Sequence, residues 1–121
     1  MEYALIIDGK RQVTRESSEV RNPSTGELVG RMPNALPQDL ENAIAAAKRA
    51  FATWSLRPDE ERRAACHAIA DKIEAHAEEL AQLLTAEQGK PLNGLGSRFE
   101  LGGTVAWTRA TADLQIKPEV I

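Results

Sequence analysis

One stretch of the chain, EQGKPLNGLGSR from Glu87 to Arg98, combines three glycines with a lysine and could hold a phosphate group. A phosphate-binding loop of the G-x-x-x-x-G-K-[ST] type places its lysine directly after the second glycine. Here Lys90 follows the first glycine, and Pro91 removes a backbone N–H that such a loop would use. The dinucleotide pattern G-x-G-x-x-G fails too, because GLGSRF lacks its third glycine and follows an expected helix. We therefore interpret Gly89 as a helix stop and Pro91 as the start of the next helix.

One cysteine and two histidines could in principle do nucleophilic or metal chemistry. Cys66 falls on the apolar stripe of an expected helix, where thiols are usually inert packing residues. Its neighbour His67 points about 100° away around that helix, which is a poor position for a catalytic base. His67 and His76 are nine positions apart, outside the spacings that bring two ligands together on one helix. We interpret Cys66 as a core residue and both histidines as surface residues.

The acidic run and the two tryptophans also have structural interpretations. Asp59–Glu61 follows Pro58 at an expected helix start, where negative charge offsets the helix dipole. Trp54 and Trp107 lie at helical spacing, which favours packing in a core over stacking on a base or a sugar. The residue types and spacings therefore predict no catalytic residue, no cofactor-binding residue and no metal ligand in this chain.

The composition describes a small acidic chain with a thin core. Of its 121 residues, 42% are hydrophobic, but 19 are alanine and only five are aromatic, so large side chains supply little buried surface. The net charge is −3, and no block of Lys or Arg offers a surface for nucleic acid. A single cysteine excludes an internal disulfide and fits a cytoplasmic protein. We expect no membrane partner, because there is no spanning apolar run and no signal peptide.

The first third of the chain has the pattern of short strands and tight turns. We expect strands near residues 4–8, 10–14, 18–22 and 27–32. Asp8-Gly9 is a hairpin turn signal, and the Asn22–Gly26 stretch NPSTG is a second tight turn. This region, about residues 1–34, is expected to form antiparallel hairpins.

From Pro37 the period of the apolar residues becomes helical, which predicts a mainly α-helical region over about residues 37–112. One expected stripe consists of Leu40, Ile44, Ala47, Phe51 and Trp54. A second consists of Cys66, Ile69, Ile73, Ala77, Leu80 and Leu84, with a possible break near 75–77. A third helix over 91–112 is weaker, because Gly94, Gly96, Gly102 and Gly103 each cost about 1 kcal/mol within a helix. Residues 113–121 alternate as a strand would.

The order of motifs is more specific than any one of them. IIDGK, NPSTGELVG, DLENAIAAAKRAFATW, ERRAACHAIADKIEAHAEELAQLLTAEQGKP and WTRATADLQI follow one another along the chain. Together they resemble the N-terminal part of the NAD(P)-dependent aldehyde dehydrogenase superfamily, and NPSTGE and E-x-G-K-P are the most telling pieces. The LNGLGSRFELGG stretch departs from the polar, helix-favouring residues that many relatives have there. This departure lowers the expected stability of the third helix and leaves the resemblance unchanged.

The resemblance implies an α/β parent fold and a parent oxidoreductase that oxidises an aldehyde to an acid. In that family a cysteine thiolate attacks the aldehyde, hydride passes to NAD⁺ or NADP⁺, and a glutamate activates water to release the acid. Cys66 does not match the family nucleophile, and the family's catalytic and cofactor residues correspond to positions after Ile121. The resemblance therefore implies that residues 1–121 are an N-terminal fragment of the cofactor-binding domain, inactive alone and without bound NAD or NADP, with 113–121 starting a linking strand.

The resemblance also implies partners. In many members main-chain carbonyls hold a structural alkali cation, and two of the positions match Val20 and Glu87. The remaining ligand would come from later in the parent chain, so we expect no formed metal site here. The expected partners are the remainder of the aldehyde dehydrogenase chain and further copies in a homo-oligomer. Self-association through the Leu40–Trp54 stripe or the terminal strand is expected, and a clean monomer in sedimentation at high concentration would contradict it.

The alternative is a stand-alone helical interaction or oligomerisation module derived from the same family, without enzymatic activity. The coding sequence after Ile121 separates the two hypotheses. A continuation resembling the family's next motif, P-W-N, would exclude the independent module.

Overall fold

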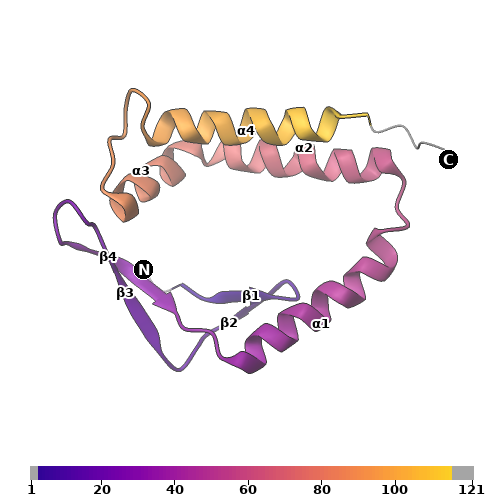
Figure 1. Ribbon diagram of the computed structural model, residues 1–121, viewed down its shortest axis with the longest axis horizontal. Helices are drawn as coiled ribbons and strands as arrows, with labels where there is room; N and C mark the ends of the chain where they lie inside the picture. The colour runs from indigo at the N-terminus through magenta and orange to yellow at the C-terminus, as the bar shows by residue number, and fades with distance from the viewer. Residues whose placement is uncertain (1–2, 116–121) are drawn as a thin grey trace, which may run out of the picture. The chain divides into compact units, whose positions relative to one another are not determined.

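The computed structural model describes residues 3–115, which form four strands and four helices in the order ββββαααα (Figure 1). The described residues divide into two compact units. The first comprises the residues up to Arg57 together with Ala86–Gly89, and the second comprises Pro58–Thr85 and the residues from Lys90 onward. The strands are β1 (Leu5–Ile7), β2 (Lys10–Gln12), β3 (Ser17–Arg21) and β4 (Leu28–Pro33). The helices are α1 (Pro37–Trp54), α2 (Asp59–Ala75), α3 (Ala77–Gln88) and α4 (Ser97–Asp113).

The strands form two separate antiparallel hairpins, β1 with β2 and β3 with β4. The first turns at Asp8 and Gly9, whose φ values of 54° and 70° are the positive pair that a two-residue hairpin turn requires. The four strands lie where the alternating pattern predicted them. The expected hairpins and this turn are therefore confirmed.

The β3–β4 hairpin is closed by the NPSTG turn. The Asn22 side-chain oxygen accepts hydrogen bonds from the backbone N–H groups of Ser24 (2.9 Å) and Thr25 (3.3 Å). Gly26 leaves the turn with a φ of 76°, a conformation that favours glycine. The register of the two strands shifts between Val20 and Arg21, which places a bulge beside the turn.

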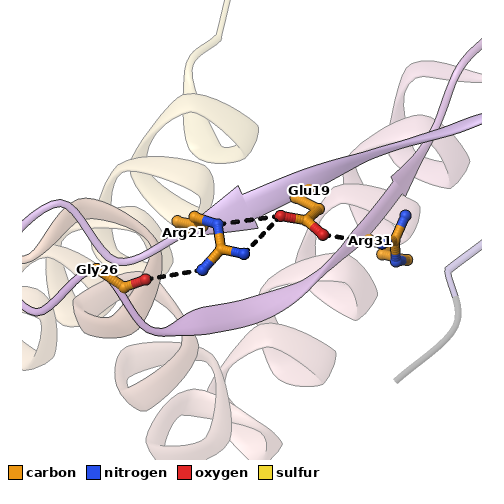
Figure 2. Close-up of polar contacts among 4 residues, drawn as sticks. All are labelled: Glu19, Arg21, Gly26 and Arg31. Carbon is orange, nitrogen blue, oxygen red and sulfur yellow. Dashed lines mark hydrogen bonds and ion pairs between the residues drawn. The ribbon is translucent and has the colours of Figure 1, made fainter.

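An ion-pair cluster lies across the same hairpin. Figure 2 shows Glu19 between Arg21 and Arg31, with N–O distances of 2.7 and 2.8 Å. Arg21 also donates to the carbonyl oxygen of Gly26 (3.0 Å), so it joins the strand to the end of the turn. The hydrogen bonds from Arg21 lower the pKa of Glu19, and the charge of Arg31 adds to the shift.

Helix α1 begins at Pro37, as its sequence predicted, and Asp39 accepts a hydrogen bond from the backbone N–H of Leu36 (2.9 Å) at that end. Ala46 is its buried residue, and α1 contacts β1. Its large apolar side chains are exposed, for example Phe51 at 66% and Trp54 at 46%. The expectation that Trp54 packs in a core is therefore wrong.

The second unit is a layer of helices in which α2 and α4 lie side by side (Figure 1). The expected break in the long helical pattern is confirmed, because α2 ends at Ala75 and α3 begins at Ala77. The buried positions of α2 and α3 are Ala70 and Ala81, both at 0% exposure. Ile69 (55% exposed) and Leu80 (36%) were predicted on the buried stripe and are not buried. The fully buried residues of α2 and α3 are thus alanines, whereas α4 buries Leu101 and Val105.

Helix α4 begins six residues later than the pattern predicted, at Ser97 instead of residue 91. Gly94 has a φ of 66°, which a right-handed helix does not contain, and Gly96 is the last residue before the helix. The helix ends at Asp113, so the predicted strand over 113–121 does not begin where expected. Residues 116–121 of that predicted strand lie outside the described residues. None of the helices described here is long and apolar enough to cross a bilayer.

Candidate functional site

The first unit contains a cavity of about 480 Å³ beside the β3–β4 hairpin. Its walls include Val20 and Val29 from the hairpin and Glu87 and Gln88 from the last turn of α3. The structure thus brings together Val20 and Glu87, the two positions to which the family resemblance assigned cation-binding carbonyl groups. They are 67 positions apart in sequence, and only the resemblance pointed to them.

The cavity walls fit an oxygen-bound cation in kind but not in number. Glu87 belongs to the last helical turn, where carbonyl oxygens have no partner within the helix. Hard cations such as Ca²⁺ take about six or more oxygen ligands, whereas two matched positions supply two main-chain oxygens. In the described part of the chain, no three His, Cys, Asp or Glu residues cluster as a site built from side-chain ligands would require.

One polar contact joins the two motifs that carry the family resemblance most strongly. The hydroxyl of Ser24, in NPSTG, donates to the carbonyl oxygen of Gly89, in EQGKP, at 2.8 Å. Gly89 ends α3 with a φ of 65°, and a Cβ there would overlap the Ser24 hydroxyl and lie 3.0 Å from the Pro23 ring. Both the conformation and the close approach therefore require glycine, which confirms the predicted helix stop.

The rest of the glycine-containing stretch folds back on itself. Backbone N–H groups of Gly96, Ser97 and Arg98 donate to carbonyl oxygens of Asn93, Pro91 and Leu92, at 3.0 to 3.2 Å. Lys90 forms an ion pair with Glu100. The N–H groups and the amine that a phosphate loop would offer are thus engaged within the second unit. The predicted helix stop at Gly89 is confirmed, whereas the predicted helix start at Pro91 is wrong, because α4 begins at Ser97.

Cys66 lies in the second unit, on the wall of a cavity of about 550 Å³ that Arg63 and Trp107 also line. The thiol is half-buried, so the prediction that Cys66 is a core residue is only partly confirmed. The neighbouring His67 contacts Asp113, with 2.8 Å between Nε2 and the carboxylate oxygen. Trp107 is 76% exposed, which makes its predicted core position wrong.

Ion pairs hold α4 to its neighbours, and the sequence did not indicate them. Arg109 contacts Asp71 and Glu74 of α2, both at 2.7 Å, and these contacts raise the pKa of Arg109. Arg98 donates two hydrogen bonds to the carboxylate of Glu78 in α3, at 2.6 and 2.8 Å. The partners are at least 20 positions apart, beyond the spacings that a local pattern reveals.

The Arg98–Glu78 pair predicts a pH dependence of stability. Hydrogen bonds from Arg98, with a smaller one from Gln82, lower the pKa of Glu78 to about 2. A lowered carboxyl pKa stabilises the folded state fully above the unfolded value of about 4.3, and the stabilisation is lost as pH falls towards 2. When the pH falls from about 5 to about 2.5, we expect the Tm of the Glu78→Gln variant to fall by less than the Tm of the wild type.

The matched control is Glu60→Gln, which removes an exposed carboxylate from the first turn of α2. Thermal unfolding followed by circular dichroism at each pH gives the comparison. Identical pH slopes for Glu78→Gln and Glu60→Gln would contradict the assigned role of Arg98.

Comparison with known proteins places this geometry in a family. The model of the aldehyde dehydrogenase family matches residues 10–119. A probable aldehyde dehydrogenase of Pseudomonas sp is 41% identical over 119 residues, which cover 98% of this chain and 24% of that protein. The chain thus spans about a quarter of the length of this curated relative.

Two solved structures share the architecture. PnpE in complex with nicotinamide adenine dinucleotide is 36% identical with a TM-score of 0.84, over 93% of this chain and 23% of that one. The NADP-dependent glyceraldehyde-3-phosphate dehydrogenase of Bacillus halodurans C-125, complexed with NADP, is 28% identical with a TM-score of 0.88, over 93% of this chain and 24% of that one. The motifs, the family match and these structures agree: the chain belongs to the aldehyde dehydrogenase family and corresponds to its N-terminal region.

Proposed function

We propose that this chain is the N-terminal part of an NAD(P)-dependent aldehyde dehydrogenase subunit, in which it acts as a scaffold and supplies no catalytic group. The observation that carries the proposal is the family match over residues 10–119 in a chain that spans about a quarter of its relative. In domain terms, residues 1–121 would be the N-terminal fragment of the cofactor-binding domain.

The reaction of the complete subunit would be the oxidation of an aldehyde to a carboxylic acid. Covalent catalysis of this kind needs a thiolate with a base within hydrogen-bond reach. In this chain the one thiol, Cys66, is followed by His67, which points about 100° away around α2 and is poorly placed as its base. We therefore propose that none of its residues forms or releases the covalent intermediate.

The complete subunit would use NAD or NADP as the hydride acceptor. The two solved relatives named above were bound to one or the other, so we propose the cofactor class and leave the choice between them open. When bound, the nicotinamide would accept hydride from the substrate. We propose that the cofactor contacts, like the remaining cation ligand, belong to later parts of the polypeptide, and that this chain binds neither alone.

The proposal assigns two kinds of partner. One is the remainder of the aldehyde dehydrogenase polypeptide, which agrees with the fraction of the relatives that this chain spans. The other is a further copy in a homo-oligomer, for which the exposed α1 side chains Leu40, Ile44 and Phe51 are candidates. A cytoplasmic location also stays a prediction.

The test is an enzyme assay on the isolated chain. We expect the purified 121 residues to form NADH or NADPH no faster than a protein-free blank, across a panel of aliphatic, aromatic and semialdehyde substrates. The Pseudomonas relative, assayed in parallel, shows that the conditions support turnover. Aldehyde-dependent reduction of NAD(P)⁺ by the isolated chain, abolished by Cys66→Ser, would contradict the proposal.

The exposed apolar side chains of α1 favour a second candidate, an independent helical interaction module without enzymatic activity. Such a module would bind a partner helix through Leu40, Ile44 and Phe51. The coding sequence downstream of Ile121 discriminates the two: a stop codon supports the module, and a continuing aldehyde dehydrogenase sequence excludes it.

A further inference from the structure

Helix α4 is apolar on two opposite sides. Its buried side carries Leu101, Val105 and Ala112, each at most 9% exposed. At about 100° per residue, the opposite side carries another apolar row. We call this row the outward face of α4; it consists of Phe99, Gly103, Ala106, Trp107 and Ala110. Phe99 and Trp107 are 61% and 76% exposed.

None of the charged residues of α4 belongs to the outward face. The helix has four of them, and each is paired with a residue of the second unit. Arg98 pairs with Glu78, Glu100 with Lys90, Arg109 with Asp71 and Glu74, and Asp113 with His67. The hydroxyls of Thr104 and Thr108 donate to carbonyl oxygens of α4 itself, at 2.8 and 2.7 Å. The outward face is left with no charged or hydroxyl side chain.

Helix α2 shows what a solvent-facing side looks like in the same unit. Opposite its buried Ala70 lie Glu61, Ala68 and Lys72, so charge is mixed with alanine. A helix with one apolar side and one charged side is typical of a protein surface, whereas a helix that is apolar on both sides is typical of an interior. By this comparison, α2 is an outer helix and α4 is an inner one.

We propose that the outward face of α4 packs against the polypeptide that follows this region in the same aldehyde dehydrogenase subunit. The inference rests on the proposed function. Relatives of the same architecture have about three quarters of their length outside the part that this chain matches, which is ample chain to cover one helix face. The absence of charge from the face fits a permanent interior contact, since transient interfaces are more polar.

Gly103 adds a geometric detail to this contact. It lies in the interior of α4, where glycine weakens a helix. Apart from its chain neighbours and the nearby backbone of α4 itself, no atom of the described residues lies within 4 Å of the place its Cβ would take. Between Phe99 and Trp107, this position leaves room for a second backbone to approach closely. The covering segment therefore lies across α4 near Gly103, with an aromatic side chain on each side.

The test uses a full-length chimera in which this chain replaces the matching region of the Pseudomonas relative. Ala106→Glu places a charge at the centre of the outward face, and Ala68→Glu places the same charge on the outer side of α2. Both sites are exposed alanines within helices, and each has a basic residue one turn later, Arg109 or Lys72. In the isolated chain, both substitutions should leave the far-ultraviolet circular dichroism unchanged.

In the chimera, Ala106→Glu should lower the yield of folded, active enzyme at least about tenfold, because it buries a charge whose nearby basic residue, Arg109, is already paired with Asp71 and Glu74. Ala68→Glu should stay within about twofold of the unsubstituted chimera, as surface changes usually do. Equal effects of the two substitutions would overturn the proposal. An Ala106→Glu chimera that is folded and active but smaller in sedimentation would assign the face to a contact between subunits, and would overturn it too.

The controls separate this inference from the proposed function. Activity of the unsubstituted chimera tests the proposed function, and the ratio between the two variants tests the outward face. If the chimera does not fold, the same two charges are placed at the aligned positions of the Pseudomonas relative itself. The expected result is again an at least tenfold loss of folded, active enzyme from the α4 substitution alone. Equal yields of the two variants again overturn the proposal.

Discussion

Gly96→Ala is expected to destabilise the second unit by about 2–4 kcal/mol, although it adds a single methyl group. A Cβ on Gly96 would overlap the carbonyl oxygen of Pro91 and lie 2.7 Å from its carbonyl carbon and 2.8 Å from the carbonyl oxygen of Asn93. All three atoms belong to the backbone, which cannot rotate away as a side chain can. The two carbonyl groups also accept hydrogen bonds from Ser97 and Gly96, so moving them weakens both bonds.

The matched control is Gly102→Ala, which is expected to stabilise the isolated chain by about 0.5–1 kcal/mol. Gly102 lies within α4, and among residues 3–115 no atom other than its neighbours and the adjacent helix backbone lies within 4 Å of its Cβ position. The two substitutions are chemically identical and have opposite predicted signs. Urea unfolding with an unchanged m-value measures both. A Gly96→Ala chain as stable as the wild type would show that the turn before α4 differs from the one described.

The second large effect distinguishes the two apolar sides of α4. Leu101→Ala is expected to cost the isolated chain about 2–4 kcal/mol, because Leu101 is 9% exposed and the small core cannot refill the space. Phe99→Ala, which removes a larger side chain from the opposite side, is expected to change stability by no more than about 0.5 kcal/mol. The order of the two effects is thus the reverse of the order of side-chain size.

Unfolding of the two variants by urea, followed by circular dichroism, gives this comparison. The result depends on which side of α4 packs within the chain itself. A Phe99→Ala variant as unstable as Leu101→Ala would mean that the outward face is already covered in the isolated chain. Such a result would also remove the reason to seek a covering segment elsewhere.

The hairpins and helix ends were predictable because single residues determine them. Asp8-Gly9, Gly26 and Gly89 adopt positive φ values, and each lies where the sequence predicted a turn or a helix end. The start of α4 was not predictable in the same way. Apolar spacing continued from Leu92 through Leu95, but the backbone at Gly94 and Gly96 excludes a helix there. Periodicity records which side chains could share a face, not whether the backbone between them is helical.

The buried faces were partly mispredicted for a related reason. The apolar pattern predicted Ile69 and Leu80 on a buried stripe, whereas Ala70 and Ala81 are the fully buried residues of these helices. Alanines allow two helices to approach closely, and the larger side chains beside them are left on the outside. Trp54 and Trp107, which were predicted to pack in a core, are also exposed. Under the proposed function, we expect these large exposed apolar side chains to contact the remainder of the subunit.

The residues that meet at the candidate site are far apart in the sequence, so local patterns could not predict their contacts. Val20 and Glu87 line one cavity, and Ser24 contacts Gly89, yet each pair is more than 60 positions apart. No spacing rule within the chain connects them. The resemblance to a family connected Val20 with Glu87, because it carries information about positions that meet only after folding, whereas nothing in the sequence predicted the contact between Ser24 and Gly89. The contact between Ser24 and Gly89 gives a physical reason for NPSTG and EQGKP to occur in one chain.

The central claim is that this chain is the N-terminal scaffold of an aldehyde dehydrogenase subunit and supplies none of its catalytic groups. The most direct measurement is the initial rate of aldehyde-dependent NAD(P)H formation by the unsubstituted chimera with the Pseudomonas relative, compared with the same chimera carrying Cys66→Ser. We predict an active chimera whose rate is unchanged by Cys66→Ser. A folded chimera without activity, or one whose activity disappears with the Cys66 thiol, would contradict the claim.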